Sequence, residues 1–251
     1  MNFQKNKFQK AGFQDNMAYC IPYGIFDGQV NMDTDKNLLD MAMERSLSPI
    51  LRFYGWQTPT VTIGRNQADS CVNTCYCKSN NINIIKRITG GRAVLHHQEL
   101  TYSFICPKDF LKHGSSVINS YKEISQGLVQ GFKEFGIELD YPEHKKVFPD
   151  NGYCMAVSTG SDLSWRGKKL IGSAQCRKND YILQHGSILF NLDKELLTGI
   201  FNSGEVCGEV TTLNEINKEI TLNQVVNSIK SGFEKHFSIK FQDVSFFKDS
   251  G

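Results

Sequence analysis

Two cysteines of the chain, Cys154 and Cys207, have surroundings in which a nucleophile could act. A nucleophilic cysteine needs a basic or cationic neighbour that lowers its pKa from about 8.5. Cys154 follows a polar stretch and precedes a strand that contains a lysine, so Lys169, Arg92 or a histidine could be that neighbour. On the residues alone the two cysteines are equivalent candidates, and for each the alternative is an inert, buried thiol.

Lys169 stands at the start of a predicted strand, residues 169–175. Alternation along a strand would place Lys169, Ile171 and Ser173 on one face. Gly172 and Ser173 are small, so the lysine could enter a pocket, where partial desolvation would lower its pKa and allow proton transfer near neutral pH. The alternative is an edge-strand lysine that discourages aggregation.

The segment at residues 86–97 has the composition of a ligand-binding loop. Gly90 and Gly91 follow a predicted strand, and Arg87 and Arg92 flank them. Glycines let the backbone approach a ligand closely, and nearby cations suit a phosphate, a carboxylate or a thioester carbonyl. The segment is neither a Walker A loop nor a dinucleotide fingerprint. A hairpin turn with solvated basic residues is the alternative.

A further pair, His185 and Gly186, lies within the predicted strand at residues 181–190. The histidine could orient a substrate, and the glycine would leave room for it. A structural strand histidine is the alternative.

The spacing of apolar residues predicts clustered strands with a few helices. Helices are expected at 33–46, 117–135 and 222–237, and strands at 51–56, 60–63, 82–88, 93–95, 100–106, 162–165, 169–175 and 181–190. We expect strands 93–95 and 100–106 to form a hairpin. Strands that cluster rather than alternate with helices are typical of an α+β domain, with a mixed, largely antiparallel sheet flanked by helices. We therefore predict one catalytic domain at residues 18–251 after a flexible tail at residues 1–17.

Composition excludes several classes of protein. The 28 basic and 26 acidic residues are nearly balanced, which is not the signature of a nucleic-acid-binding protein. No segment has the roughly 18 apolar residues of a membrane helix, and no signal peptide is evident, so a cytoplasmic protein is expected. The spacing of Cys71, Cys75 and Cys77 does not match a structural zinc site, and we predict no metal.

Five segments, in order, resemble the lipoate–protein ligase and octanoyltransferase superfamily. They read NMDTDKNLL at 31–39, RFYGW at 52–56, PTVTIGRNQ at 59–67, KRITGGRAVLH at 86–96 and GKKLIGSAQ at 167–175. The resemblance runs from about Gly28 to Glu215 and implies the fold of biotin and lipoyl protein ligase catalytic domains. The reactive-centre lysine of the superfamily falls on Lys169.

Within the superfamily the sequence is most similar to the cysteine-dependent octanoyl-[acyl carrier protein]:protein octanoyltransferases. Their nucleophile lies a short loop before the lysine strand, where this chain has Cys154. A second transferase branch places its cysteine before a glycine in a late loop, as in Cys207-Gly208. An ATP-dependent lipoate ligase, or an amidotransferase that relays octanoyl or lipoyl groups between lipoyl domains, remains the alternative. The segment at 63–67 is similar to ligases, and His96-His97 replaces the usual His-Asp.

The resemblance implies a thioester mechanism without a cofactor. Cys154 would accept an octanoyl group from acyl carrier protein and pass it to a lysine of a lipoyl domain or a glycine-cleavage H-type protein, with Lys169 moving protons. Basic clusters at 86–92, 145–146 and 166–169 could steer these acidic partners. The alternative for each cluster is an ordinary solvated surface, which is favoured for Lys145 and Lys146. The residues expected to bind substrate are Arg87, Gly90, Gly91, Arg92, His96, Gly172, Ser173, His185 and Gly186.

Overall fold

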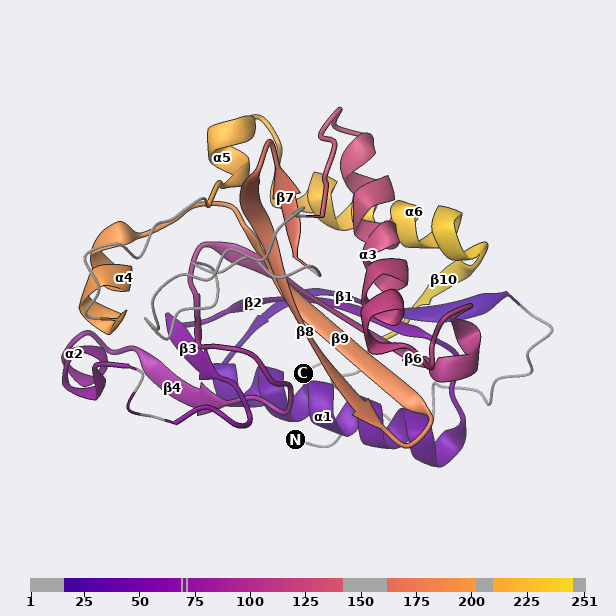
Figure 1. Cartoon of the computed structure of the whole chain (residues 1–251), viewed down its shortest axis with the longest axis horizontal. Helices are drawn as coiled ribbons and strands as arrows, with labels where there is room; N and C mark the ends of the chain where they lie inside the picture. Colours follow the sequence, from indigo (N-terminus) through magenta and orange to yellow (C-terminus); the bar gives the residue numbers. More distant parts are fainter. Residues whose placement is uncertain (1–15, 69, 71, 142–161, 202–209, 246–251) are drawn as a thin grey trace.

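The computed structural model describes residues 16–68, 70, 72–141, 162–201 and 210–245. In this part of the chain, ten strands form a seven-stranded and a three-stranded sheet, with helices packed on them (Figure 1). The strands are β1 Met17–Phe26, β2 Ile50–Trp56, β3 Thr60–Ile63, β4 Asn83–Lys86, β5 Val94–His96, β6 Glu99–Pro107, β7 Leu163–Trp165, β8 Lys168–Lys178, β9 Tyr181–Leu189 and β10 Lys240–Asp243. The helices are α1 Gly28–Arg45, α2 Thr74–Ser79, η3 Lys108–Phe110, α3 Val117–Lys133, α4 Lys194–Phe201, α5 Leu213–Ile216 and α6 Leu222–Phe237.

The large sheet is mixed, in the strand order β10-β1-β2-β6-β9-β8-β7. Strand β1 pairs in parallel with β10 and β2, whereas the pairs from β2 across to β7 are antiparallel. This confirms the predicted α+β class with a largely antiparallel sheet. In the small sheet, β3 pairs in parallel with β4 and antiparallel with β5.

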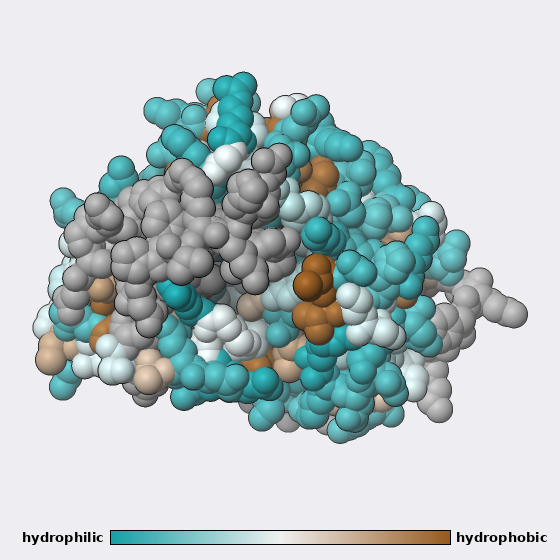
Figure 2. Space-filling model, viewed as in Figure 1, coloured by the Kyte–Doolittle hydropathy of each residue, from teal (hydrophilic) through white to brown (hydrophobic). Residues whose placement is uncertain are grey.

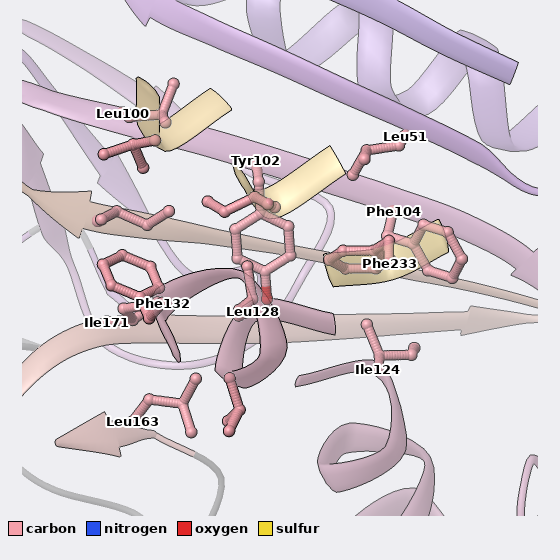
Figure 3. Close-up of a cluster of buried hydrophobic side chains, with 14 of the residues drawn as sticks. Leu51, Leu100, Tyr102, Phe104, Ile124, Leu128, Phe132, Leu163, Ile171 and Phe233 are labelled. Carbon is pink, nitrogen blue, oxygen red and sulfur yellow. The ribbon is translucent and has the colours of Figure 1, made fainter. Parts of the chain in front are cut away.

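Helices cover both faces of the large sheet. Helix α1 packs on one face through Leu38, Leu39 and Ala42, while α3 and α6 pack on the other. Figure 3 shows the second of these layers, in which Tyr102 and Phe104 of β6 face Leu128 of α3 and Phe233 of α6. Strands β6 and β9, at the centre of the sheet, are buried along their whole length. The site described below therefore rests on a rigid, two-sided core.

Most predicted elements are confirmed to within a few residues, but one predicted strand pairing is wrong and one strand was missed. Strands β5 and β6 do not form a hairpin, because β5 joins β3 in the small sheet and β6 lies between β2 and β9. The fully buried β6 requires a hydrogen-bonded neighbour on each side, and β2 and β9 supply longer ladders than a three-residue strand could. Strand β1 was not predicted. Pro22 lies within it, where the register with β2 shifts between Ile21 and Gly24.

The surface is largely hydrophilic on the face shown in Figure 2, with a small hydrophobic area. Among the described residues, none of the helices is both long enough and apolar enough to span a bilayer.

Candidate active site

A cavity lies where both sheets and α1 meet. Its apolar side chains include Met32, Val94 and Ala174. The residues that line it are Met32, Tyr54, Thr62, Arg87, Val94, His96, Thr101, Gly172, Ser173, Ala174, His185, Gly186 and Ser187.

Six of the nine predicted substrate-binding residues line this cavity: Arg87, His96, Gly172, Ser173, His185 and Gly186. Gly90, Gly91 and Arg92 are not among the lining residues. The carbonyl oxygens of Gly90 and Arg92 accept hydrogen bonds from Arg87, which does line the cavity. Cys154 and Cys207 both lie outside the described residues, so the identity of the nucleophile stays a prediction.

Strands β8 and β9 bring glycines and small side chains to the cavity. Gly186 of β9 pairs with Ser173 of β8. A Cβ at Gly186 would come within 2.7 Å of the Gly172 carbonyl oxygen and of the Tyr102 ring, so only glycine fits. Tyr102 also shares a 2.8 Å hydrogen bond with the Ser173 hydroxyl, which fixes this part of the wall.

A β-bulge in β8 changes the direction of Lys169. Leu163 of β7 pairs with Ile171, but the next residue, Ser164, pairs with Lys169, so Leu170 is the extra residue. Both Leu170 and Ile171 pack in the core beneath α3 and α6. Lys169 therefore lies on the opposite face from Ile171, and the predicted strict alternation is wrong at this point. Bulges commonly redirect side chains next to functional sites.

The Lys169 side chain is wholly buried, with an exposed fraction of 0%. Its Nζ lies 2.9 Å from Oδ2 of Asp162, whose side chain is 2% exposed. The backbone of Lys169 also bridges to Val210, and its carbonyl accepts a hydrogen bond from Thr211 N at 2.9 Å. This burial excludes a solvated edge-strand lysine, but Lys169 is not among the residues that line the cavity, so its place in a substrate pocket stays a prediction.

His185 is held by a buried cluster of charged groups. Its Nδ1 lies 3.0 Å from Asp35 Oδ2, and Asp35 Oδ1 accepts a 2.7 Å hydrogen bond from Arg52. Burial opposes ionisation of Asp35, but the Arg52 charge and the His185 hydrogen bond outweigh it and lower the carboxyl pKa. Burial and the Asp35 charge raise the pKa of Tyr54 well above its usual value, so its hydroxyl donates to Asp35 at 2.8 Å.

His96, on strand β5 of the small sheet, also lines the cavity. Its ring stacks on Trp56 at 4.0 Å between centroids, and its Nδ1 lies 3.6 Å from Glu99 Oε1. Burial lowers the pKa of His96, although Glu99 acts in the opposite direction. This wall of the cavity therefore carries an uncharged imidazole near neutral pH.

The predicted ligand loop is closely packed. Gly91 has φ +89°, a left-handed conformation that glycine adopts without strain. A Cβ at Gly64 would collide with the Gly91 carbonyl oxygen, so a second glycine is needed where the loop crosses the end of β3. Arg87 is buried, as is Lys169, so neither can steer a partner at the surface, whereas Lys86, Arg166 and Lys168 are exposed.

The prediction missed the residues that support the site, chiefly Asp35, Arg52, Tyr54 and Asp162. One signal was present, because Asp35 precedes Leu38 and Leu39 by three and four residues. That spacing places an acid on the buried stripe of α1, where it needs a cationic partner.

Comparison with known proteins identifies the family. The sequence model of the lipoyl protein ligase A/B catalytic domain matches residues 27–234. Octanoyltransferase LipM of Carboxydothermus hydrogenoformans is 35% identical over 233 residues, which cover 88% of this chain and 87% of the relative. Octanoyltransferase LipM of Staphylococcus epidermidis is also 35% identical, and 84% of each chain is covered.

Solved structures agree on the fold. A lipoate-protein ligase A bound with ATP superposes with a TM-score of 0.75 at 22% identity, covering 92% of this chain and 90% of that one. The bipartite lipoate protein ligase of Thermoplasma acidophilum gives a TM-score of 0.72 at 21% identity, covering 92% and 88% of the two chains. The predicted biotin/lipoyl protein ligase type of fold is confirmed.

Proposed function

The chain belongs to the lipoyl protein ligase A/B catalytic domain family, and we propose that it is an octanoyltransferase of lipoate biosynthesis. It is an acyltransferase that attaches an octanoyl group to a protein substrate. One observation carries this conclusion: curated octanoyltransferases are 31–35% identical to this chain over 84–90% of its length.

In the first half-reaction, the Cys154 thiolate attacks the carbonyl carbon of octanoyl-acyl carrier protein. A new C–S bond forms to Cys154, the C–S bond to the carrier breaks, and the carrier leaves as a thiol after gaining a proton. Lys169 accepts the proton of the Cys154 thiol and returns it to the leaving thiolate. Covalent catalysis divides one difficult transfer into two easier ones.

In the second half-reaction, a lysine amine of the acceptor attacks the thioester. An amide bond forms, the C–S bond to Cys154 breaks, and the proton lost by the amine returns through Lys169 to the Cys154 sulfur. The reaction runs from thioester to amide, so it needs no nucleotide. A lipoyl domain or a glycine-cleavage H-type protein is the proposed acceptor.

The described residues support two parts of this scheme. Lys169 is buried against Asp162 at 2.9 Å, which holds Nζ in one place and away from water. The cavity has apolar walls at Met32, Val94 and Ala174, which suit an octanoyl chain. Backbone N–H groups near Gly90 and Gly91 are candidates for the oxyanion site, where one donor is often worth about 3–4 kcal/mol.

The test uses the purified chain, a lipoyl domain and one acyl source at a time. Octanoyl-acyl carrier protein without nucleotide is expected to give octanoylated lipoyl domain, and free octanoate with ATP is expected to give none. The opposite pattern would assign the chain to the ATP-dependent ligases. Octanoyl-lipoyl domain as the sole donor tests the relay reaction separately.

A further inference from the structure

Arg87 was predicted to bind substrate, but all five of its N–H groups have partners inside the protein. Nε donates to Thr89 Oγ1 at 3.1 Å, and Nη1 donates to the carbonyl and hydroxyl oxygens of Thr62 at 2.9 and 3.2 Å. Nη2 donates to the carbonyl oxygens of Gly90 and Arg92, both at 2.7 Å. The guanidinium therefore joins β3 to the ligand loop and offers a ligand no unengaged donor.

Thr62 and Thr89, whose hydroxyl groups accept hydrogen bonds from Arg87, each lie against one histidine. Thr62 Oγ1 lies 2.8 Å from His96 Nε2, and Thr89 Oγ1 lies 2.8 Å from His185 Nε2. Each hydroxyl oxygen already accepts a hydrogen bond from Arg87, so its own proton is available for the imidazole. If each hydroxyl uses this proton, both histidines accept at Nε2.

The other ring nitrogen of each histidine faces a carboxylate. His185 Nδ1 lies 3.0 Å from Asp35, and His96 Nδ1 lies 3.6 Å from Glu99. A neutral imidazole that accepts at Nε2 carries its proton on Nδ1, where these carboxylates attract it. The result is a hydrogen-bonded chain of six buried side chains, Asp35, His185, Thr89, Arg87, Thr62 and His96, and Glu99 lies 3.6 Å from its end; none of the seven is more than 7% exposed.

We propose that Arg87 is a positioning residue, which acts through Thr62 and Thr89 to hold His96 and His185 in the same neutral Nδ1–H tautomer on two walls of the substrate cavity. The guanidinium donates to both hydroxyl oxygens and so fixes the direction of each hydroxyl proton. Each hydroxyl group in turn fixes the tautomer of one imidazole. Two uncharged rings then face the ligand, and the positive charge stays behind them. The inference rests on the proposed function only for the identity of the ligand, an acyl chain.

The direct test is the tautomer of each ring. Protein labelled with ¹⁵N-histidine is measured by long-range ¹H–¹⁵N correlation, well above the usual histidine pKa of about 6.5. His→Gln variants assign the signals of the six histidines. Both His96 and His185 are expected to show protonated Nδ1 and unprotonated Nε2. A predominant Nε2–H form at either ring would overturn the proposal.

Three variants then ask whether Arg87 controls both rings. Thr62→Val should change the signals of His96 alone, Thr89→Val those of His185 alone, and Arg87→Lys those of both. Thr62→Ser and Thr89→Ser keep the hydroxyl and should retain the wild-type tautomer. If Arg87→Lys does not fold, the valine and serine variants at Thr62 and Thr89 still test the proposal. Unchanged histidine signals in both valine variants would contradict it.

Thr60→Val is the matched control for Thr62→Val. Thr60 is buried on the same strand and pairs with His96 across the small sheet, but its hydroxyl donates to the Thr58 carbonyl oxygen at 3.0 Å. Because this hydroxyl donates to a backbone carbonyl, Thr60→Val should leave both histidines in the wild-type tautomer. With octanoyl-acyl carrier protein, Thr62→Val and Thr89→Val should lower kcat/KM by about tenfold, as expected for one lost buried hydrogen bond. The tautomers are read without catalysis, so failure of this inference and failure of the proposed function are distinguishable.

Discussion

Lys169 and Asp162 form a wholly enclosed pair, with Nζ and Oδ2 2.9 Å apart and side-chain exposures of 0% and 2%. The bulge at Leu170 makes this possible, because without the extra residue Lys169 would point with Ile171 into the apolar core. A lysine held in this way is positioned for proton transfer, and the first prediction follows from it.

Lys169→Ala should slow both half-reactions by about 10²–10⁴-fold, since general acid–base groups usually contribute that much. Lys169→Arg should not restore activity, because a guanidinium cannot accept a proton near neutral pH. Rapid-quench measurement of acyl-enzyme formation and of transfer would separate the two steps. Full activity in Lys169→Arg would end the proton-transfer assignment while leaving the family assignment intact.

Asp35 is expected to make stability depend on pH. Its pKa is lower in the folded protein than in the unfolded chain, because Arg52 and His185 together outweigh the cost of burial. Its contribution is therefore fully present above the unfolded pKa of about 3.9 and is lost as pH falls through the folded value.

Asp35→Asn should cost about 3–5 kcal/mol at neutral pH, as expected when one partner of a buried ion pair is removed. Urea unfolding at several pH values measures this loss, which should shrink in acid. Asp40→Asn is the control, because Asp40 lies on the same helix but pairs with Lys178 at the surface. An equal loss in both variants would contradict the role given to Asp35.

Two glycines of the ligand loop should respond differently to alanine. Gly64→Ala forces a Cβ into the Gly91 carbonyl oxygen, so it should displace the loop and lower the unfolding midpoint. Gly90→Ala meets nothing within 4 Å and should leave the midpoint unchanged. If Gly90 approaches the acyl donor as predicted, the same variant should raise KM. Wild-type KM would remove Gly90 from the binding site.

The sequence predicted the parts of the site that depend on local pattern. Glycines beside cations marked the loop, and His185-Gly186 marked the facing strand; Arg87, His185 and Gly186 do line the cavity. What failed depends on contacts between distant segments. Asp35 and His185 are 150 residues apart in sequence, and nothing near either residue indicates the other.

Two local rules were also overridden by the sheet. Strict alternation would place Lys169 and Ile171 on the same face of β8, but the bulge at Leu170 puts the lysine on the opposite face. Proximity in sequence paired β5 with β6, but the burial of β6 on both faces places it between β2 and β9. Bulges and strand order are set by the packing of the whole sheet, so short segments do not reveal them.

An octanoyl group is proposed to pass through a thioester on Cys154. Intact-protein mass spectrometry after incubation with octanoyl-acyl carrier protein, without nucleotide or acceptor, tests it directly. We predict one octanoyl adduct that hydroxylamine removes and that Cys154→Ser abolishes, whereas Cys207→Ser retains it. An adduct that persists in Cys154→Ser and disappears in Cys207→Ser would place the nucleophile at Cys207, and no adduct in the wild-type protein would contradict the thioester mechanism itself.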